Sequence, residues 1–162
     1  MLKEIARLTE QKVTNNRPQT QQKRISFVKE GNKTKAAQSK ASPVSFFDGA
    51  KDWNLQVDLN KHVKIQKEIL QTNLRPDLVV TSGKKKILGM MELTVPYEDR
   101  IEVSREWKKS KYQEIVNAGE SKGWKVTLWS VEVGCRGFPA VSLGNYLRDI
   151  GFSGAERTKH LK

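Results

Sequence analysis

The sequence predicts a single α/β domain whose mixed central sheet is flanked by helices. Two apolar runs, 78–80 and 87–95, are separated by a short polar turn, which is typical of a β-hairpin. A long amphipathic segment then leads to a third apolar run, 125–133, and a helix between two buried strands forms a crossover. The sheet is therefore expected to be antiparallel at the hairpin and parallel across the helix. At 162 residues, the chain has room for one domain of this kind.

The first 45 residues are expected to form a basic tail that is mostly disordered. They contain ten Lys or Arg residues against three acidic ones. From 14 to 43 the segment has few large apolar side chains, so it cannot bury enough surface to offset the entropy lost on ordering. Three apolar residues near the start recur at helical spacing, and whether they dock onto the domain stays open: Leu2, Ile5 and Leu8.

The elements of the domain are expected within 46–155. Apolar residues that alternate with polar ones predict a half-buried strand: Trp53, Leu55, Val57 and Leu59. Residues 60–74 suit a strand or a short helix, and their pattern does not decide between the two. After the hairpin, a helix is expected over 100–122, because Asp99 can cap its start and Gly123 can stop its end. A last short helix is expected over 140–150, which leaves 156–162 as a basic C-terminal tail.

The chain is strongly basic, with a net charge of +12 and a sequence pI of about 9.9. Basic proteins attract polyanions such as nucleic acid or acidic lipid headgroups, and the N-terminal tail suits either a phosphate-binding arm or a solvated leader. No apolar run approaches the length of a membrane-spanning helix, and the N-terminus lacks the apolar stretch of a signal peptide. The single cysteine, Cys135, excludes a disulfide framework within the chain. We therefore expect a soluble, intracellular protein with no membrane partner.

A carboxylate interrupts the apolar strand at 87–95. Glu92 lies among Leu, Met and Val residues on a strand that is apolar on both faces, as a central strand must be. A buried carboxylate costs several kcal/mol unless it is neutralised, paired or bound to a metal. Glu92 is therefore the first candidate for a functional residue.

The hairpin is expected to bring a second acid to the same face. A two-residue turn places Asp77 opposite Met90, on the face that Met90 shares with Glu92 and Thr94. Carboxylates at such diagonal positions, roughly 7–8 Å apart, can converge on one hard cation that prefers oxygen ligands. The prediction depends on the turn, because a shift of one residue would send the two acids to opposite faces.

Two cations lie on the apolar stripe of the predicted helix. At about 100° per residue, Arg105 and Lys108 fall in line with Ile101, Tyr112 and Ile115. One interpretation is that their stems are buried while their charged ends reach water. The other is that Lys108 points at the acid pair, where it balances the negative charge or stabilises a scissile phosphate.

Three short blocks of sequence together resemble a known family. They are Arg75-Pro76-Asp77, the segment Glu92-Leu93-Thr94-Val95-Pro96-Tyr97-Glu98, and Lys108 followed by Lys111-Tyr112. In this order they resemble the restriction-like endonuclease domain of site-specific non-LTR retrotransposons, a branch of the PD-(D/E)XK superfamily that also occurs in retroelement-derived proteins. The resemblance covers roughly 53–152 and implies a restriction-endonuclease-like mixed sheet flanked by helices.

The resemblance implies metal-dependent hydrolysis of a DNA phosphodiester. Asp77 and Glu92 would hold Mg²⁺ or Mn²⁺, and an activated water would attack in line. The superfamily places a lysine two residues after the glutamate, where this chain has Thr94, and the branch takes its lysine from the following helix, which points to Lys108. Four other side chains are expected to support the site: Thr94, Arg105, Lys111 as the weaker candidate for the lysine, and Tyr112. Glu132 is a lesser candidate for a further ligand.

Three functions remain open at this point. The first is an active endonuclease with DNA as its partner and a nuclear rather than a cytoplasmic location. The second is a catalytically decayed nucleic-acid-binding domain, a retroelement remnant, which is favoured because a reverse transcriptase and a zinc knuckle do not fit into 162 residues. The third is a small interaction domain whose charge is incidental. The sequence does not indicate an oligomeric state.

Overall fold

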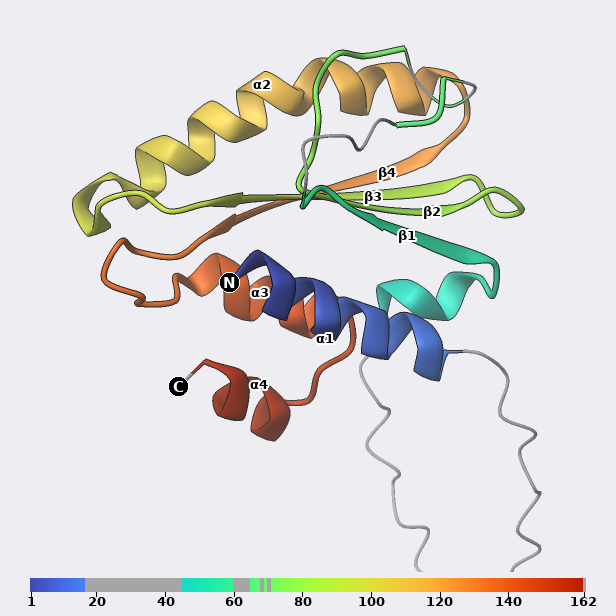
Figure 1. The fold of residues 1–162 in the computed structure, drawn as a ribbon. Helices are drawn as coiled ribbons and strands as arrows, with labels where there is room; N and C mark the ends of the chain where they lie inside the picture. Colours follow the sequence, from blue (N-terminus) through green and yellow to red (C-terminus); the bar gives the residue numbers. More distant parts are fainter. Residues whose placement is uncertain (17–44, 60–64, 68, 70, 162) are drawn as a thin grey trace, which may run out of the picture.

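A four-stranded sheet forms the middle of the molecule, with helices on both of its faces (Figure 1). The computed structural model describes residues 1–16, 45–59, 65–67, 69 and 71–161. The strands are β1 (Trp53–Val57), β2 (Leu78–Ser82), β3 (Ile87–Thr94) and β4 (Lys125–Glu132). The helices are α1 (Leu2–Asn15), α2 (Ile101–Ser121), α3 (Val141–Asp149) and α4 (Gly154–His160). Helix α2 covers one face, and α1 and α3 cover the other.

The sheet is mixed, as predicted. Its order is β1-β2-β3-β4, with antiparallel pairing from β1 to β3 and parallel pairing between β3 and β4. The parallel pair is joined by α2, which is the expected crossover. The fold is therefore a mixed α/β architecture with a four-stranded sheet flanked by helices.

The hairpin between β2 and β3 has a longer turn than predicted. Ser82 pairs with Ile87, so four residues form the turn instead of two. The carboxylate of Asp52, which precedes β1, accepts hydrogen bonds from the Ser82 hydroxyl at 2.7 Å and from the Lys84 backbone N–H at 2.9 Å. These bonds hold the wider turn, in which Lys86 adopts a positive φ of 51°. The predicted two-residue turn was therefore wrong.

The wider turn shifts the register by two residues. Leu78 lies opposite Met91, so continuing the ladder by one residue brings Asp77 opposite Glu92 and not opposite Met90. A shift of two residues keeps every side chain on its expected face, because side chains alternate with a period of two. The two acids are therefore direct cross-strand neighbours on the α2 face of the sheet.

Helix α2 begins one residue later than predicted, with Arg100 and not Asp99 at its N-cap. A short 3₁₀ helix, Glu98–Arg100, precedes it, and its N-cap residue makes no side-chain capping bond. The carboxylate of Glu98 instead accepts a hydrogen bond from the Arg136 N–H at 3.1 Å, which fastens the start of α2 to the turn after β4. At the other end Gly123 has a φ of +77°, a left-handed conformation that suits the predicted helix stop.

The N-terminal residues belong to the folded domain. Helix α1 buries Ile5 and Leu8 in the core on the lower face of the sheet in Figure 1, which answers the question that their spacing left open. The hydroxyls of Thr9 and Tyr146 lie 2.7 Å apart and tie α1 to α3. The rest of the expected tail, 17–44, lies outside the described residues.

The end of the chain also departs from expectation. The predicted helix at 140–150 is present as α3, and Gly151 follows it with a φ of +96°. Most of the segment expected as a C-terminal tail lies in α4, whose N-terminus is capped by the Ser153 side chain and by Glu156. No helix in the described part of the chain is both long and apolar enough to span a membrane.

Among the described residues, the core on the α2 face contains fewer buried residues than the core on the opposite face. It consists of Ile65, Ile69, Val79, Leu88, Met90, Tyr112 and Ile115. Ile65 and Ile69, with the partly buried Leu74 packed against this core, come from the ambiguous segment 60–74, part of which lies outside the described residues. Along β3 the apolar row on this face ends at Met90, and the next position is Glu92. The polar end of this row is where the candidate site lies.

Candidate active site at the polar end of the sheet

The candidate site lies under the first half of α2, where β3 and β4 end. Four side chains share this face in two neighbouring pairs, with Glu92 beside Ser130 and Thr94 beside Glu132. Asp77 precedes β2 and lies next to Glu92 by the register described above. The sequence therefore placed Asp77, Glu92 and Thr94 on the correct face.

Glu92 is buried, and both of its carboxylate oxygens are engaged. Only 6% of the residue is exposed. The ammonium of Lys108 donates a hydrogen bond to Oε1 and forms an ion pair with it. The hydroxyl of Tyr112 donates to Oε2 at 2.9 Å. Lys108 and Tyr112, one helical turn apart on α2, thus compensate the charge that the sequence flagged as costly.

Asp77 is half-buried and carries an unfavourable charge. Its Oδ2 accepts a hydrogen bond from the Leu93 backbone N–H at 2.8 Å, which turns the carboxylate toward β3. Burial, with a further contribution from the neighbouring Glu92, raises the pKa of Asp77, although the bond from Leu93 and the charge of Lys108 act in the opposite direction. Asp58 also raises this pKa. Burial is therefore the main cost of the charge on Asp77, and Glu92 and Asp58 add to it.

Tyr112 connects three segments of the site. Its hydroxyl oxygen lies 2.9 Å from Glu92 on β3 and 3.2 Å from the backbone carbonyl oxygen of Arg75, which precedes β2. Burial and the charges of Glu92 and Asp77 raise the pKa of Tyr112 well above its usual range, so the hydroxyl keeps its proton. Tyr112 therefore positions Glu92 and also packs in the core of the α2 face.

Three further polar side chains nearby have atoms without a hydrogen-bond partner among the described residues. They are Thr94 Oγ1, Arg105 Nε and Glu132 Oε2. Glu132 is fully buried, and its other oxygen accepts a hydrogen bond from Ser130. Arg105 reaches an exposed acid, Glu102, with its terminal nitrogen, as expected for a side chain with a buried stem. Thr94 carries no charge and cannot replace a lysine.

Of the two candidate lysines, Lys108 is the one that contacts the acids. Lys111 is exposed, and its ammonium lies 5.4 Å from the ring centroids of Trp107 and of Tyr112. The sequence analysis did not identify Trp107, which is 60% exposed and lies 5.5 Å from the Lys108 ammonium. Trp107 could have been found from the sequence, because it is an aromatic residue adjacent to Lys108 that lies outside the apolar stripe of the helix.

The acid pair fits a hard divalent cation. Asp77 and Glu92 offer only oxygen donors, each carboxylate oxygen has more than one lone pair, and a cation would stabilise the charged form of Asp77, which burial disfavours. Among the described residues no three His, Cys, Asp or Glu side chains are close enough to hold a metal together. Mg²⁺ commonly binds through one or two carboxylates, with water and substrate phosphate completing its coordination.

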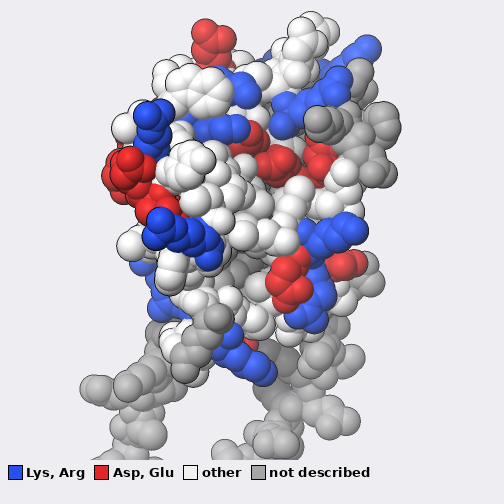
Figure 2. Space-filling model, turned by 60° about the vertical axis from the view of Figure 1, so that its left-hand side comes forward, with Lys and Arg blue, Asp and Glu red and all other residues white. Residues whose placement is uncertain are grey.

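The surface around the pair carries both signs of charge. Figure 2 views the end of the molecule where β3 leads into α2, and acidic side chains gather there between Lys and Arg side chains. A cation and a phosphate group could therefore both find opposite charge within this surface.

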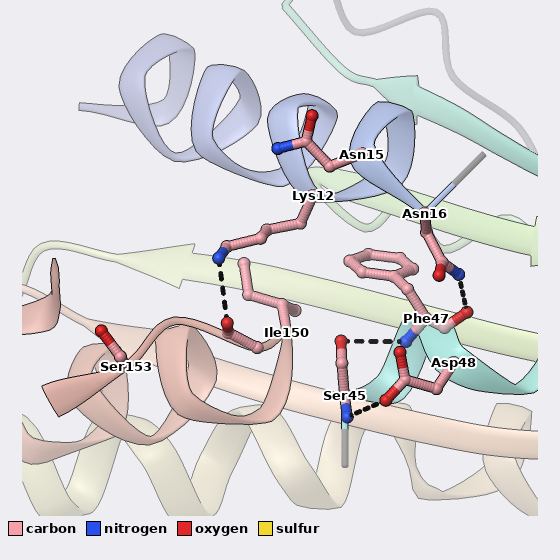
Figure 3. A pocket seen from close by; sticks show the side chains of 9 residues that line it. Lys12, Asn15, Asn16, Ser45, Phe47, Asp48, Ile150 and Ser153 are labelled. Atoms are coloured by element: carbon pink, nitrogen blue, oxygen red, sulfur yellow. Dashed lines mark hydrogen bonds between the residues drawn. The ribbon is translucent and has the colours of Figure 1, made fainter. Parts of the chain in front are cut away.

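The pocket in Figure 3 lies on the opposite face of the sheet and does not form part of this site. It has a volume of about 340 Å³ and lies between the end of α1, the 3₁₀ helix Phe46–Gly49 and the turn after α3. Its polar groups bond to the protein itself: Lys12 donates to the Gly151 carbonyl at 2.9 Å, and the Ser45 N–H donates to Asp48 at 2.6 Å. We assign it a structural role.

Comparisons with known proteins do not assign the chain to a class. Neither the protein-family models nor the curated proteins match it, and no solved structure does. The mixed α/β fold and the geometry of the acid pair are therefore the basis for a functional proposal.

Proposed function

We propose that this protein is a Mg²⁺- or Mn²⁺-dependent DNA endonuclease of retrotransposon origin with a restriction-endonuclease-like fold. The observation that carries the proposal is the convergence of Asp77, Glu92 and Lys108 on one face of the sheet. Two acids from neighbouring strands and one lysine form the set of groups that metal-dependent phosphodiester hydrolysis requires. The resemblance of the sequence blocks around these residues supports the same activity.

The proposed division of labour follows the contacts. Asp77 and Glu92 hold the cation, which when bound polarises a phosphate oxygen and lowers the pKa of a bound water. Tyr112 fixes the orientation of Glu92 through its 2.9 Å hydrogen bond. Lys108 supplies a positive charge beside the acids, where negative charge develops on the phosphate. In this scheme Lys108 performs the task that Thr94 cannot.

The charge of the protein supports DNA as the substrate. The net charge of +12 favours a polyanionic partner, and α2 carries three lysines within one helical turn: Lys108, which contacts the acid pair, and Lys109 and Lys111, which are exposed. With DNA as the proposed substrate, we also propose a nuclear rather than a cytoplasmic location.

Nicking of supercoiled plasmid DNA tests the activity. With Mg²⁺ or Mn²⁺ present, the wild-type chain should convert the plasmid to the open circle, and Asp77→Asn and Glu92→Gln should not. Glu106→Gln is the matched control, because Glu106 is an exposed acid on α2 whose ion pair, within the described part of the chain, is with Lys109. Nicking that persists in both site variants at the wild-type rate would refute the proposal.

Metal binding can be measured without substrate. Mn²⁺ at 100 times its dissociation constant should stabilise the wild-type protein by about 2.7 kcal/mol in a thermal melt. Glu92→Gln should abolish this gain. Salt-sensitive DNA binding without metal-dependent stabilisation or nicking would instead identify the protein as a catalytically decayed nucleic-acid-binding domain.

A further inference from the structure

Trp107 presents a large aromatic surface to solvent at the border of the acid pair. It is 60% exposed, whereas Trp53, Trp124 and Trp129 are partly or fully buried. Tryptophan is a large apolar side chain that folding tends to bury, so an exposed ring next to a charged site suggests a ligand. Trp107 also makes no contribution to either hydrophobic core.

Lys108 lies near both the Trp107 ring and the acid pair. The Lys108 ammonium lies 5.5 Å from the centroid of the Trp107 ring and also forms the ion pair with Glu92. A second ammonium, that of Lys111, lies 5.4 Å from the same centroid. The ring therefore lies close to two ammonium groups, one of which is bound to Glu92 of the acid pair.

This combination suits a nucleotide better than a protein partner. An aromatic ring can stack on any base, because every base has a π-face, while nearby lysines neutralise the phosphates on either side. A protein partner that covered Trp107 would also have to bury the exposed Lys111, and lysine is depleted at the centres of protein interfaces. Among the described residues Lys111 forms no ion pair that would reduce its attraction for phosphate.

We propose that Trp107 is a stacking platform for an unpaired base next to the phosphate that enters the acid pair. In duplex DNA the bases are stacked on one another and their faces are covered, so a platform of this kind selects DNA that is single-stranded or opened at that point. The inference rests on the proposed function in taking nucleic acid as the ligand and the acid pair as the place where its phosphate binds.

Binding of single-stranded DNA by the full chain tests the platform. The probe is a fluorescent oligothymidine of about 12 nucleotides, and the readout is fluorescence anisotropy at one fixed salt concentration with EDTA present. Trp107→Ala should weaken binding about tenfold, and Trp107→Phe should retain most of the affinity because it keeps a ring. Val103→Ala is the matched control, since Val103 is 70% exposed one turn earlier on α2 and should not affect binding. Trp107→Ala should reduce the affinity of the protein for a duplex of the same length less than it reduces the affinity for the single strand.

Each other outcome overturns the platform. The first two are a wild-type protein that does not bind the single strand and a Trp107→Ala protein that binds it with wild-type affinity. The other two are a Val103→Ala protein that loses as much affinity as Trp107→Ala, and a loss of duplex affinity in Trp107→Ala equal to its loss of single-strand affinity. Because EDTA removes any metal, the result is independent of catalysis. If Trp107→Ala loses affinity for the single strand and the wild-type chain does not nick DNA, the platform is supported and the nuclease is refuted. If Trp107→Ala binds normally and the wild-type chain nicks DNA, the nuclease is supported and the platform is refuted.

Discussion

Replacing Lys108 by methionine should destabilise the protein in the absence of metal and DNA. The side chain of Glu92 is 8% exposed and that of Lys108 is 16% exposed, so their ion pair is nearly buried. Methionine keeps most of the volume of the lysine stem and removes only the charge. Glu92 would then remain as a buried carboxylate without a cation.

The size of the effect follows from this burial. Removing one partner of a buried ion pair costs about 3–5 kcal/mol. We expect the lower end, about 3 kcal/mol, because Tyr112 still donates a hydrogen bond to Glu92 and water can reach the exposed part of the site. For a domain of this size the melting temperature should fall by roughly 9 °C.

Urea denaturation of four proteins measures the pair directly. The set is the wild type, Lys108→Met, Glu92→Gln and the double variant, in which the uncompensated charge is gone and most of the stability should return. Lys109→Met is the control, because its exposed pair with Glu106 is expected to contribute no more than about 1 kcal/mol. A Lys108→Met protein that unfolds at the wild-type urea concentration, or a double variant whose loss equals the sum of the single losses, would contradict the reasoning.

Two further predictions concern other parts of the fold. Asp77→Asn should raise the melting temperature near neutral pH without metal, because the raised pKa of Asp77 means that folding disfavours its charged form. The gain should disappear as the pH is lowered through the ordinary aspartate range, about 4, because wild-type Asp77 then takes up a proton; an equal gain at both pH values would contradict this explanation. Gly89→Ala should destabilise the protein by about 1–3 kcal/mol, since a Cβ there would lie 2.8 Å from the Trp129 ring and 2.9 Å from the Phe46 ring. A thermal melt equal to that of the wild type would show that both rings can move aside.

The parts of the site that were predictable depended on local patterns. Glu92 was identifiable because a single charge interrupted an apolar strand, and Lys108 because helical periodicity aligned it with buried residues. The face of Asp77 followed from alternation along the hairpin. In each case the signal came from residues within one or two elements of the sequence.

The parts that were missed depended on contacts between distant residues. The turn length was set by Asp52, which bonds to Ser82 from 30 positions away, so the turn residues alone suggested a shorter loop. Helix α1 docks through Thr9 onto Tyr146, and that separation of 137 positions leaves no local trace. Trp107 was missed because periodicity shows which helix face is buried and says little about the function of an exposed face.

The bonds from Asp52 to the hairpin turn have a consequence for the alignment of the two acids. The turn lies at the far end of β2 from Asp77, roughly 15 Å away along the strand, and touches none of the catalytic candidates. Even so, its four residues decide which residue of β3 faces Asp77. Were the chain to turn over residues 83 and 84 alone, the sheet and its buried faces would stay intact, but Asp77 would lie opposite Met90 and only diagonal to Glu92. A change in a turn remote from the acids would thus widen the acid pair without unfolding the protein.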